Sequence, residues 1–377
     1  HRHLLLFISL CMITFTLLAD NTVIPVYSGE FSNDMEQECY LEQQSPNWEL
    51  MKDKRKVKGI YITGNTVAYT ERYNKLLELV KTTELNTVVI DIKDDEGLMT
   101  YASSLQDVEF AGANKKVRIK DIDSVLKVLR ENDIYPIARI VTFKDRRAGD
   151  KYANLAVKNK NGGIWRDRNG MSWLNPYNKE SWDYIVDIAE EAAVKGFKEI
   201  QFDYVRFPTD GNIKAIDYGA DAEKPKAEAI AEFLSYARER LQSMGVVVSA
   251  DVFGLVTTDK GDMGIGQHLE SMAKSVDVIC PMVYPSHYGK GSYGVLEPDF
   301  EPYKIVNKSM SVAQQRIDIL GEKEKVALLR PWLQDFTASY LDRYKKYGAK
   351  EVRDQINAVY DSGQDEWILW NAGNIYT

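Results

Sequence analysis

The chain has 377 residues, which is long enough for one large domain or for two or three smaller ones. Hydrophobic residues make up 44% of it and charged residues 28%, as in an ordinary globular protein. The formal net charge of −8 opposes contact with a phosphate backbone, so we expect no nucleic-acid partner. The three cysteines include no CxxC pair, which argues against a zinc cage or a disulfide framework.

The amino-terminal segment predicts an exported protein. Arg2 and His3 precede an uncharged, apolar run over residues 4–19. Such a run fits a signal peptide cleaved after Ala19 or an uncleaved membrane anchor. In both cases the rest of the chain would cross a membrane and reach the cell surface or the medium. Residues 20–56 are polar and irregular, and we interpret them as a linker.

From residue 57 onward, short apolar runs rich in β-branched residues alternate with amphipathic helical patterns. The predicted strands are residues 59–64, 87–92, 135–141, 199–205, 246–252, 276–284, 326–333 and 367–371. Nearly continuous apolar strands separated by helices are typical of buried parallel sheets. Eight such units predict a (β/α)₈ TIM barrel, of the α/β class, over residues 57–377. A doubly wound sheet is the alternative, but no glycine-rich phosphate turn follows the first strand.

Two features between the strands are specific. A helix is predicted over residues 179–195, capped by Asn178 and ended by Gly196. The loop over residues 143–178 is unusually long for a compact fold, and such loops often serve as lids or binding elements.

The first candidate catalytic residue is Asp203, at the end of the fourth predicted strand. Active sites of barrels lie at the carboxyl ends of the strands. Arg206 follows closely, and an arginine favours the ionised form of a carboxyl group. An ionised carboxylate suits a nucleophile or a stabiliser of an oxocarbenium-like transition state. The alternative is a structural Asp203–Arg206 pair that closes the top of the barrel.

Asp251 and Asp91 end neighbouring strands. Apolar residues around Asp251 would raise its pKa toward use as a general acid, although a binding or capping role is the alternative. Asp91 is a candidate for substrate binding, or for a salt bridge with Lys93 or Arg139.

Aromatic and polar residues gather at the same predicted rim. Aromatic side chains stack on the apolar faces of sugar rings, while polar groups bind the hydroxyls. The candidate substrate-binding residues are Asp91, Arg139, Arg206, Tyr284, His287, Trp332, Trp370, Asn371, Trp165 and Trp173.

The sequence predicts no metal and no cofactor. His287 and His268 are isolated, and neither HxH nor HExxH occurs. The chain also lacks the GxSxG motif of serine hydrolases.

Four motifs, at residues 57–61, 89–94, 202–208 and 281–288, carry a resemblance to a known family. The chain resembles a bacterial glycoside hydrolase domain family long catalogued as a domain of unknown function, related to alpha-amylase-like barrels. The resemblance covers nearly all of residues 57–377. It implies an exported, carbohydrate-active barrel in which Asp203 is the catalytic aspartate of the fourth strand. Related barrels often carry a Glu as acid/base on the fifth strand, where this chain has Asp251.

These observations favour a glycosidase that acts on a cell-wall or extracellular polysaccharide or oligosaccharide. The distance between the two carboxyl groups would decide between retention and inversion. A barrel that binds glycan without cutting it is the second hypothesis. A lyase or a phosphate-dependent isomerase is the third, but no phosphate-binding glycines follow the last two strands.

Overall fold

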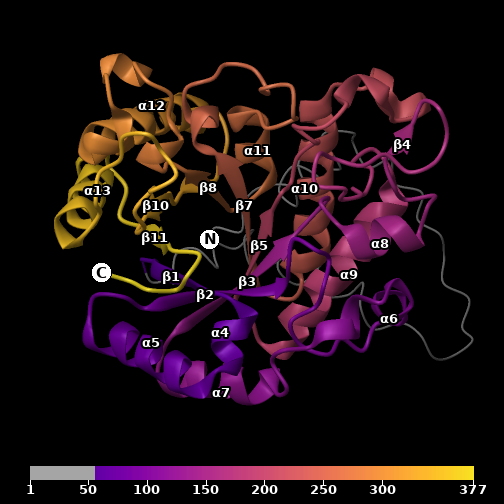
Figure 1. Ribbon diagram of the computed structural model, residues 1–377, viewed down its shortest axis with the longest axis horizontal. Helices are drawn as coiled ribbons and strands as arrows, with labels where there is room; N and C mark the ends of the chain where they lie inside the picture. The colour runs from indigo at the N-terminus through magenta and orange to yellow at the C-terminus, as the bar shows by residue number, and fades with distance from the viewer. Residues whose placement is uncertain (1–55) are drawn as a thin grey trace, which may run out of the picture. The chain divides into compact units, whose positions relative to one another are not determined.

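In the computed structural model, residues 56–377 are described, and they form a closed ring of parallel strands with helices around it (Figure 1). The order in the sheet is β10-β11-β1-β2-β3-β5-β7-β8-β9, and β10 also pairs with β8, which closes the ring. The (β/α)₈ barrel is therefore confirmed. The predicted signal peptide or anchor over residues 1–19, and all but the last residue of the predicted linker, lie outside the described residues.

Nine strands fill eight positions of the ring, because β9 and β10 share one. The strands are β1 (Lys58–Ile62), β2 (Thr87–Lys93), β3 (Tyr135–Val141), β5 (Glu199–Asp203), β7 (Val247–Phe253), β8 (Val278–Met282), β9 (Leu328–Leu329), β10 (Trp332–Gln334) and β11 (Trp367–Trp370). Helices cover the outside of the ring: α4 (Gly64–Ala68), α5 (Thr70–Thr82), α6 (Gln106–Ala111), α7 (Ile122–Glu131), α8 (Arg146–Lys151), α9 (Lys179–Lys195), α10 (Lys226–Gln242), α11 (Leu269–Ser275), α12 (Pro302–Gly321) and α13 (Ala349–Asp361).

Several strand bounds differ from the prediction by one or two residues, and in two strands the backbone gives the reason. The run over residues 326–333 is interrupted between β9 and β10 by Pro331, which has no N–H to donate to the sheet. The strand predicted over residues 199–205 stops at Asp203, since Tyr204 has a φ of 50°. This left-handed conformation is incompatible with a continuing strand.

Alternation along the strands separates two hydrophobic regions. Residues such as Val89, Ile137 and Ile368 fill the inside of the ring, together with the buried free thiol of Cys280. The intervening residues, among them Ile200, pack outward against the helices. Because side chains alternate with a period of two, every second residue of a strand faces the inside.

A buried ion triad lies at the start of β5, opposite the end that carries Asp203. Arg330 donates from Nη1 to Glu199 Oε1 at 2.5 Å and from Nε to Glu366 Oε2 at 2.7 Å. The side chains of Arg330 and Glu199 are fully buried. The Oγ of Ser249 also donates to Glu199 Oε1, at 2.6 Å. The inside of this barrel is therefore polar at both ends.

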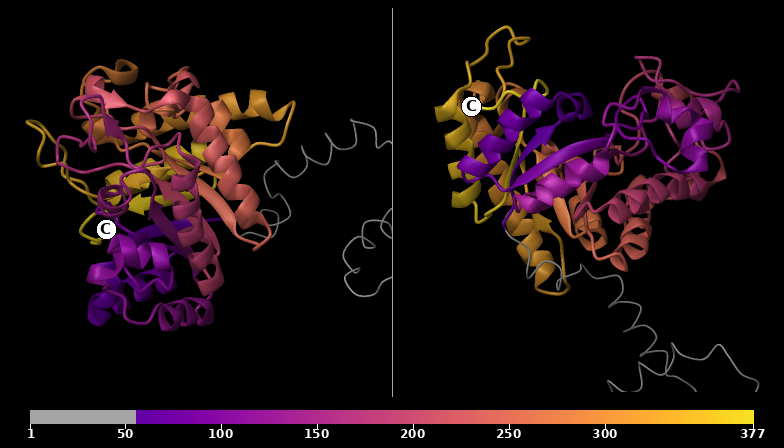
Figure 2. Two further views of the ribbon diagram at one scale, coloured as in Figure 1. Left: turned by 90° about the vertical axis from the view of Figure 1, so that its right-hand side faces the viewer. Right: turned by 90° about the horizontal axis from the view of Figure 1, so that it is seen from below.

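The segment over residues 142–178 is folded rather than irregular. It contains α8 and β4 (Lys158–Asn159), which pairs with β6 (Ile216–Asp217) of the connection after β5. A buried ion pair at 2.8 Å between Lys93 Nζ and Asp145 Oδ2 ties this segment to β2. Two further views show the segment, in magenta, projecting from one side of the barrel (Figure 2).

No helix within residues 56–377 is both long and apolar enough to cross a membrane.

Replacing Arg330 with methionine should destabilise the barrel strongly. The substitution leaves Glu199 and Glu366 buried without their cation, which costs about 3–5 kcal/mol of unfolding free energy. Urea unfolding followed by circular dichroism measures this loss. Lys350→Met, which breaks an exposed pair with Asp354, is the control and should leave the unfolding free energy nearly unchanged. Equal losses in the two variants would show that the triad is not a structural requirement.

Candidate active site

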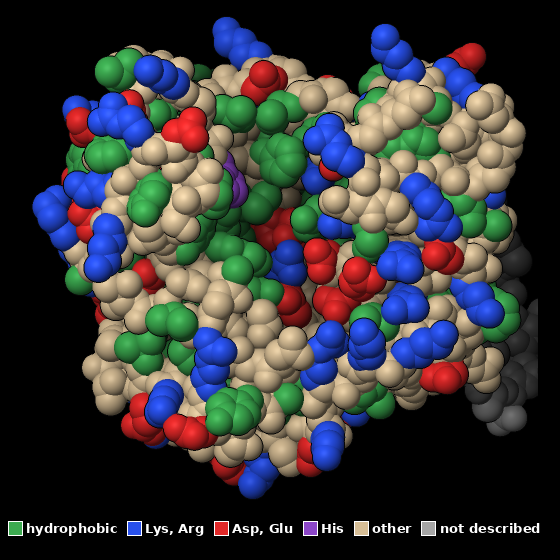
Figure 3. Space-filling view, viewed as in Figure 1, with side chains coloured by type: hydrophobic (Ala, Val, Ile, Leu, Met, Phe, Trp, Pro, Cys, Tyr) green, Lys and Arg blue, Asp and Glu red, His purple; other side chains and the backbone are tan. Residues whose placement is uncertain are grey.

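A cavity of about 440 Å³ opens at the carboxyl ends of the strands. In the space-filling view, acidic and basic side chains lie in its floor and hydrophobic side chains form much of its wall (Figure 3). Eight of the residues predicted from the sequence line it: Arg139, Asp203, Arg206, Asp251, Tyr284, His287, Trp332 and Trp370. The barrel thus brings residues from six strand ends into one space.

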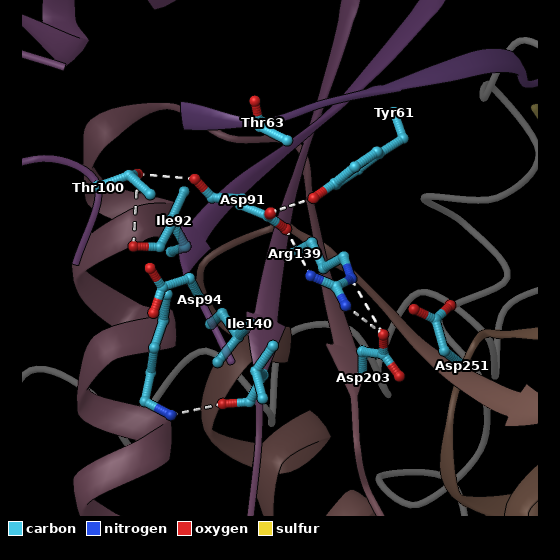
Figure 4. Close-up of polar contacts among 12 residues, drawn as sticks. Tyr61, Thr63, Asp91, Ile92, Asp94, Thr100, Arg139, Ile140, Asp203 and Asp251 are labelled. Carbon is cyan, nitrogen blue, oxygen red and sulfur yellow. Dashed lines mark hydrogen bonds and ion pairs between the residues drawn. The ribbon is translucent and has the colours of Figure 1, made fainter. Parts of the chain in front are cut away.

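Arg139 joins two carboxylates in the floor of the cavity (Figure 4). Its Nη1 donates to Asp91 Oδ1 at 2.5 Å, while Nε donates to Asp203 Oδ2 at 3.1 Å and Nη2 donates to the same oxygen. The arginine is only 6% exposed. Burial lowers the pKa of the guanidinium and its two carboxylates raise it, with a net shift well above the ordinary value.

Asp203 is held by N–H groups on both of its oxygens. Besides Arg139 on Oδ2, the backbone N–H of Tyr204 donates to Oδ1 at 2.6 Å. The left-handed conformation of Tyr204 turns the chain sharply at this point. All of these neighbours are donors, which match the acceptor oxygens of a carboxylate.

Asp251 has a different environment. It is 1% exposed, and its Oδ1 accepts a hydrogen bond from Trp332 Nε1 at 2.7 Å. Among the described residues its side chain forms no ion pair within 4.0 Å. Burial, and then the nearby charge of Asp203, raise the pKa of Asp251 well above its usual range. Asp251 is therefore the carboxyl group of the cavity that keeps its proton most readily.

Asp91 lies behind Arg139, outside the cavity lining. It forms a salt bridge with Arg139, which was one of the roles predicted for it from the sequence. It also accepts a hydrogen bond from the Tyr61 hydroxyl. Burial is the largest influence on its pKa, which is raised. Lys93, the other partner considered, pairs with Asp145 instead. Substrate binding by Asp91 stays a prediction.

Arg206 does not pair with Asp203, which corrects the interpretation from the sequence. The register of the strands gives Asp203 to Arg139, and Arg206 turns away after Tyr204. Its guanidinium carbon lies 4.9–5.1 Å from the ring centres of Trp173, Tyr204 and Phe253. Its Nη1 donates to the carbonyl of Phe207 at 3.0 Å.

Aromatic rings form one wall of the cavity. Trp370 stacks on Tyr61 with ring centres 4.0 Å apart, and Trp332 meets both rings edge-on. Tyr284 is 4% exposed and packs edge-on against the exposed ring of His287. Trp370, partly exposed beside the two carboxyl groups, is the best placed of these rings to stack on a sugar.

Besides Asp91, three predicted binding residues do not line the cavity. Trp165 and Trp173 are buried in the folded segment after β3, where their indole N–H groups bond to Asn212 O and Asp167 Oδ2. Asn371 donates to the carbonyls of Asp335 and Ile375 and organises the chain after β11. In these positions they support the walls of the cavity, and direct contact with a substrate stays a prediction for all three.

Tyr61 and Phe253 were not predicted from the sequence as residues of the site. Tyr61 lies on the inward face of β1 together with Gly59. The alternation of side chains along that strand could therefore have predicted that Tyr61 points into the barrel. Phe253 ends β7 two residues after Asp251 and lines the cavity beside it.

Among residues 56–377, no group of three or more His, Cys, Asp or Glu is arranged to hold a metal ion. The absence of a metal and of a cofactor stays a prediction.

Residues 59–376 match the model of a family described as "Putative glycosyl hydrolase domain". The chain belongs to this family. Membership places it among glycosyl hydrolase domains, as the sequence predicted. No curated protein matches the chain.

Solved structures extend the comparison. A hypothetical protein from Ruminiclostridium thermocellum is 47% identical, over 51% of this chain and 97% of that chain, with a TM-score of 0.47. The PgaB (BpsB) glycoside hydrolase domain from Bordetella bronchiseptica is 13% identical, over 84% and 94% of the two chains, with a TM-score of 0.61. The spore cortex-lytic enzyme SleL of Bacillus cereus is 11% identical, over 86% and 73%, with a TM-score of 0.50. The last two show a shared fold.

Removing the indole donor should raise the pKa of Asp251 further. The hydrogen bond from Trp332 favours the charged carboxylate and opposes the effect of burial. In Trp332→Phe we therefore expect Asp251 to titrate at higher pH than in the unmodified protein. Carbon-13 NMR of labelled aspartate carboxyl groups, with Asp251→Asn used for assignment, measures the shift. Trp367→Phe, whose indole donates to Tyr360 instead, is the control. An unchanged or lower pKa in Trp332→Phe would contradict the assigned contact.

Proposed function

We propose that this barrel hydrolyses glycosidic bonds in a cell-wall or extracellular polysaccharide, with Asp203 and Asp251 as its catalytic residues. One observation carries the proposal. Two carboxyl groups line the same cavity, and their surroundings differ: N–H groups and a guanidinium hold Asp203, whereas burial raises the pKa of Asp251. Pairs of acids whose environments separate their protonation states are the usual basis of glycoside hydrolysis.

In this mechanism Asp251 is the general acid. It transfers its proton to the oxygen of the leaving sugar as the glycosidic bond breaks. Positive charge then develops on the ring carbon and oxygen, and the Asp203 carboxylate stabilises it or bonds to it. Water finally supplies the new hydroxyl, and its second proton returns to Asp251. Arg139 acts as a positioning residue, since its contacts fix the orientation of Asp203.

The place of action is part of the proposal. It rests on the apolar run over residues 4–19, which predicts export, with anchoring to the membrane as the alternative to cleavage. A glycosidase at the cell surface or in the medium would meet polysaccharide as its substrate.

Asp203→Asn should abolish most of the activity without unfolding the protein. The amide keeps the size of the side chain but loses the charge that the transition state requires, so kcat/KM should fall by at least about 10²-fold. Release of reducing ends from a panel of polysaccharides measures the effect. Asp318→Asn, an exposed position on α12, is the matched control and should leave the rate unchanged. Full activity in Asp203→Asn would remove Asp203 from the mechanism. Binding without turnover by the unmodified protein would favour a glycan-binding barrel.

Asp251→Asn should change the pH dependence as well as the rate. The unmodified enzyme needs Asp251 protonated, so kcat/KM should fall as the pH rises through the raised pKa of this group. The variant should lose about 10²–10⁴-fold in rate on natural linkages, together with this alkaline limb. An aryl glycoside with a good leaving group needs no proton and should be affected much less. Retention of the alkaline limb in Asp251→Asn would assign the acid to another group.

A further inference from the structure

Arg206 is a buried cation that lines the cavity, and it has no carboxylate partner among the described residues. Two other buried arginines of the barrel interior each contact two carboxylates: Arg139 with Asp91 and Asp203, and Arg330 with Glu199 and Glu366. Arg206 is 7% exposed, yet none of the described carboxylate oxygens lies within 4.0 Å of its guanidinium nitrogens. An uncompensated buried charge is costly, and a bound anion would relieve the cost.

The donors of Arg206 that remain free open onto the cavity. Nη1 is used, since it donates to the carbonyl of Phe207 at 3.0 Å and more weakly to Thr209 Oγ1 at 3.5 Å. Nε and Nη2 donate to none of the described residues. They are also not enclosed by protein, in contrast to Nη2 of Arg330, which is buried and unpaired. Arg206 therefore presents unused N–H groups to a space that substrate can enter.

The surroundings fix the orientation of these donors. The rings of Trp173, Tyr204 and Phe253 pack around the guanidinium, so little side-chain freedom is lost when a ligand binds. A second cation lies close by, because Lys144 Nζ is 4.9 Å from the centre of the same Tyr204 ring. Its counter-ion, Asp95, is 3.6 Å away and largely exposed.

The two carboxyl groups of the cavity lining are partly screened from this position. Asp203 pairs with Arg139, which also pairs with Asp91, and the raised pKa of Asp251 favours its uncharged form. Burial lowers the pKa of Arg206, which is the effect expected of a cation with too little compensation. Among the described residues that line the cavity, Arg206 is therefore the guanidinium that no carboxylate pairs with.

We infer that Arg206 binds the carboxylate of an acidic sugar, so that the polysaccharide cleaved by this barrel is anionic. The inference rests on the proposed function and specifies its substrate. The planar guanidinium matches the two oxygens of a carboxylate. A uronic acid, with the carboxylate on the ring, and a sugar that carries a lactyl ether both supply this group.

Matched polymers test the inference. Polyuronides and the same polymers after chemical reduction of their carboxyl groups differ only in charge and hydrogen bonding. Bacterial peptidoglycan glycan strands, before and after reduction of their lactyl carboxyl groups, test the sugar that carries a lactyl ether. We expect the unmodified enzyme to cleave one carboxylated polymer with a kcat/KM about 10- to 100-fold above that for its reduced form. The arm that shows this ratio identifies the kind of acidic sugar.

Substitutions connect this preference with Arg206. In Arg206→Gln the ratio should fall to about one, and in Arg206→Lys, which keeps the charge but not the planar group, it should be intermediate. Arg130→Gln, at an exposed position on α7, should keep the full ratio. If Arg206→Gln fails to fold by circular dichroism, Arg206→Lys supplies the test. Equal cleavage of carboxylated and reduced polymers by the unmodified enzyme, or an unchanged ratio in the variants, would overturn the inference.

A binding measurement separates this inference from the proposed hydrolysis. Calorimetry with oligouronides and with lactyl-bearing oligosaccharides should detect binding to Asp251→Asn, and Arg206→Gln in the same background should remove it. If no polymer is cleaved but this binding is seen, hydrolysis fails and the carboxylate site stands. If neutral polymers are cleaved and no acidic oligosaccharide binds, the carboxylate site fails and hydrolysis stands.

Discussion

Arg139 supplies the positive charge that allows Asp91 and Asp203 to lie together at the top of a closed ring of strands. In the register of the sheet, Arg139 is level with Asp91 on β2 and with Gln201 on β5. Its side chain therefore extends up the barrel axis by one inward-facing position to reach Asp203. Without this cation, two carboxylates would share a dry site, and repulsion would force one of them to take up a proton. The arrangement of the floor follows from this contact.

The two candidate catalytic residues differ because Arg139 contacts Asp203 but not Asp251. Arg139 donates to Asp91 and to Asp203, but the contact that Asp251 makes is with an indole. A neutral donor compensates burial less than a guanidinium does, so Asp251 is the group whose proton is held. The acid and carboxylate roles that we propose for Asp251 and Asp203 thus depend on Arg139 pairing with only one of them. Both roles require a closed barrel in which β3, β5 and β7 stay in register.

The sequence predicted those parts of the structure that depend on local pattern. The bounds of β3 and of α9, with the cap at Asn178 and the end at Gly196, agree with the prediction because hydrophobic period and capping are local signals. It also predicted that Asp203 and Asp251 would line the same site, since the carboxyl ends of parallel strands lie at one rim of the barrel.

Features that depend on contacts between distant segments could not be predicted from local sequence pattern. The partner of Asp203 is set by the register between β3 and β5, which no local pattern specifies, and so Arg206 was given a contact that Arg139 makes. The burial of Trp165 and Trp173 depends on how the segment after β3 folds on itself, and an isolated tryptophan is compatible with either a core or a rim position. Their role as scaffold emerges only from the tertiary structure.

The polar interior explains why the two ends of the barrel differ in what they can do. At the start of the strands, the charge of Arg330 is enclosed and paired with two glutamates, so it serves the structure. At the other end, the charge of Arg139 is likewise paired, whereas Arg206 is rigid, cationic and part of the cavity lining. Folding free energy is lost by burying such a group, and evolution tolerates such losses where the group serves a function. We therefore interpret the unpaired guanidinium of Arg206 as a group that binds an anionic part of the substrate.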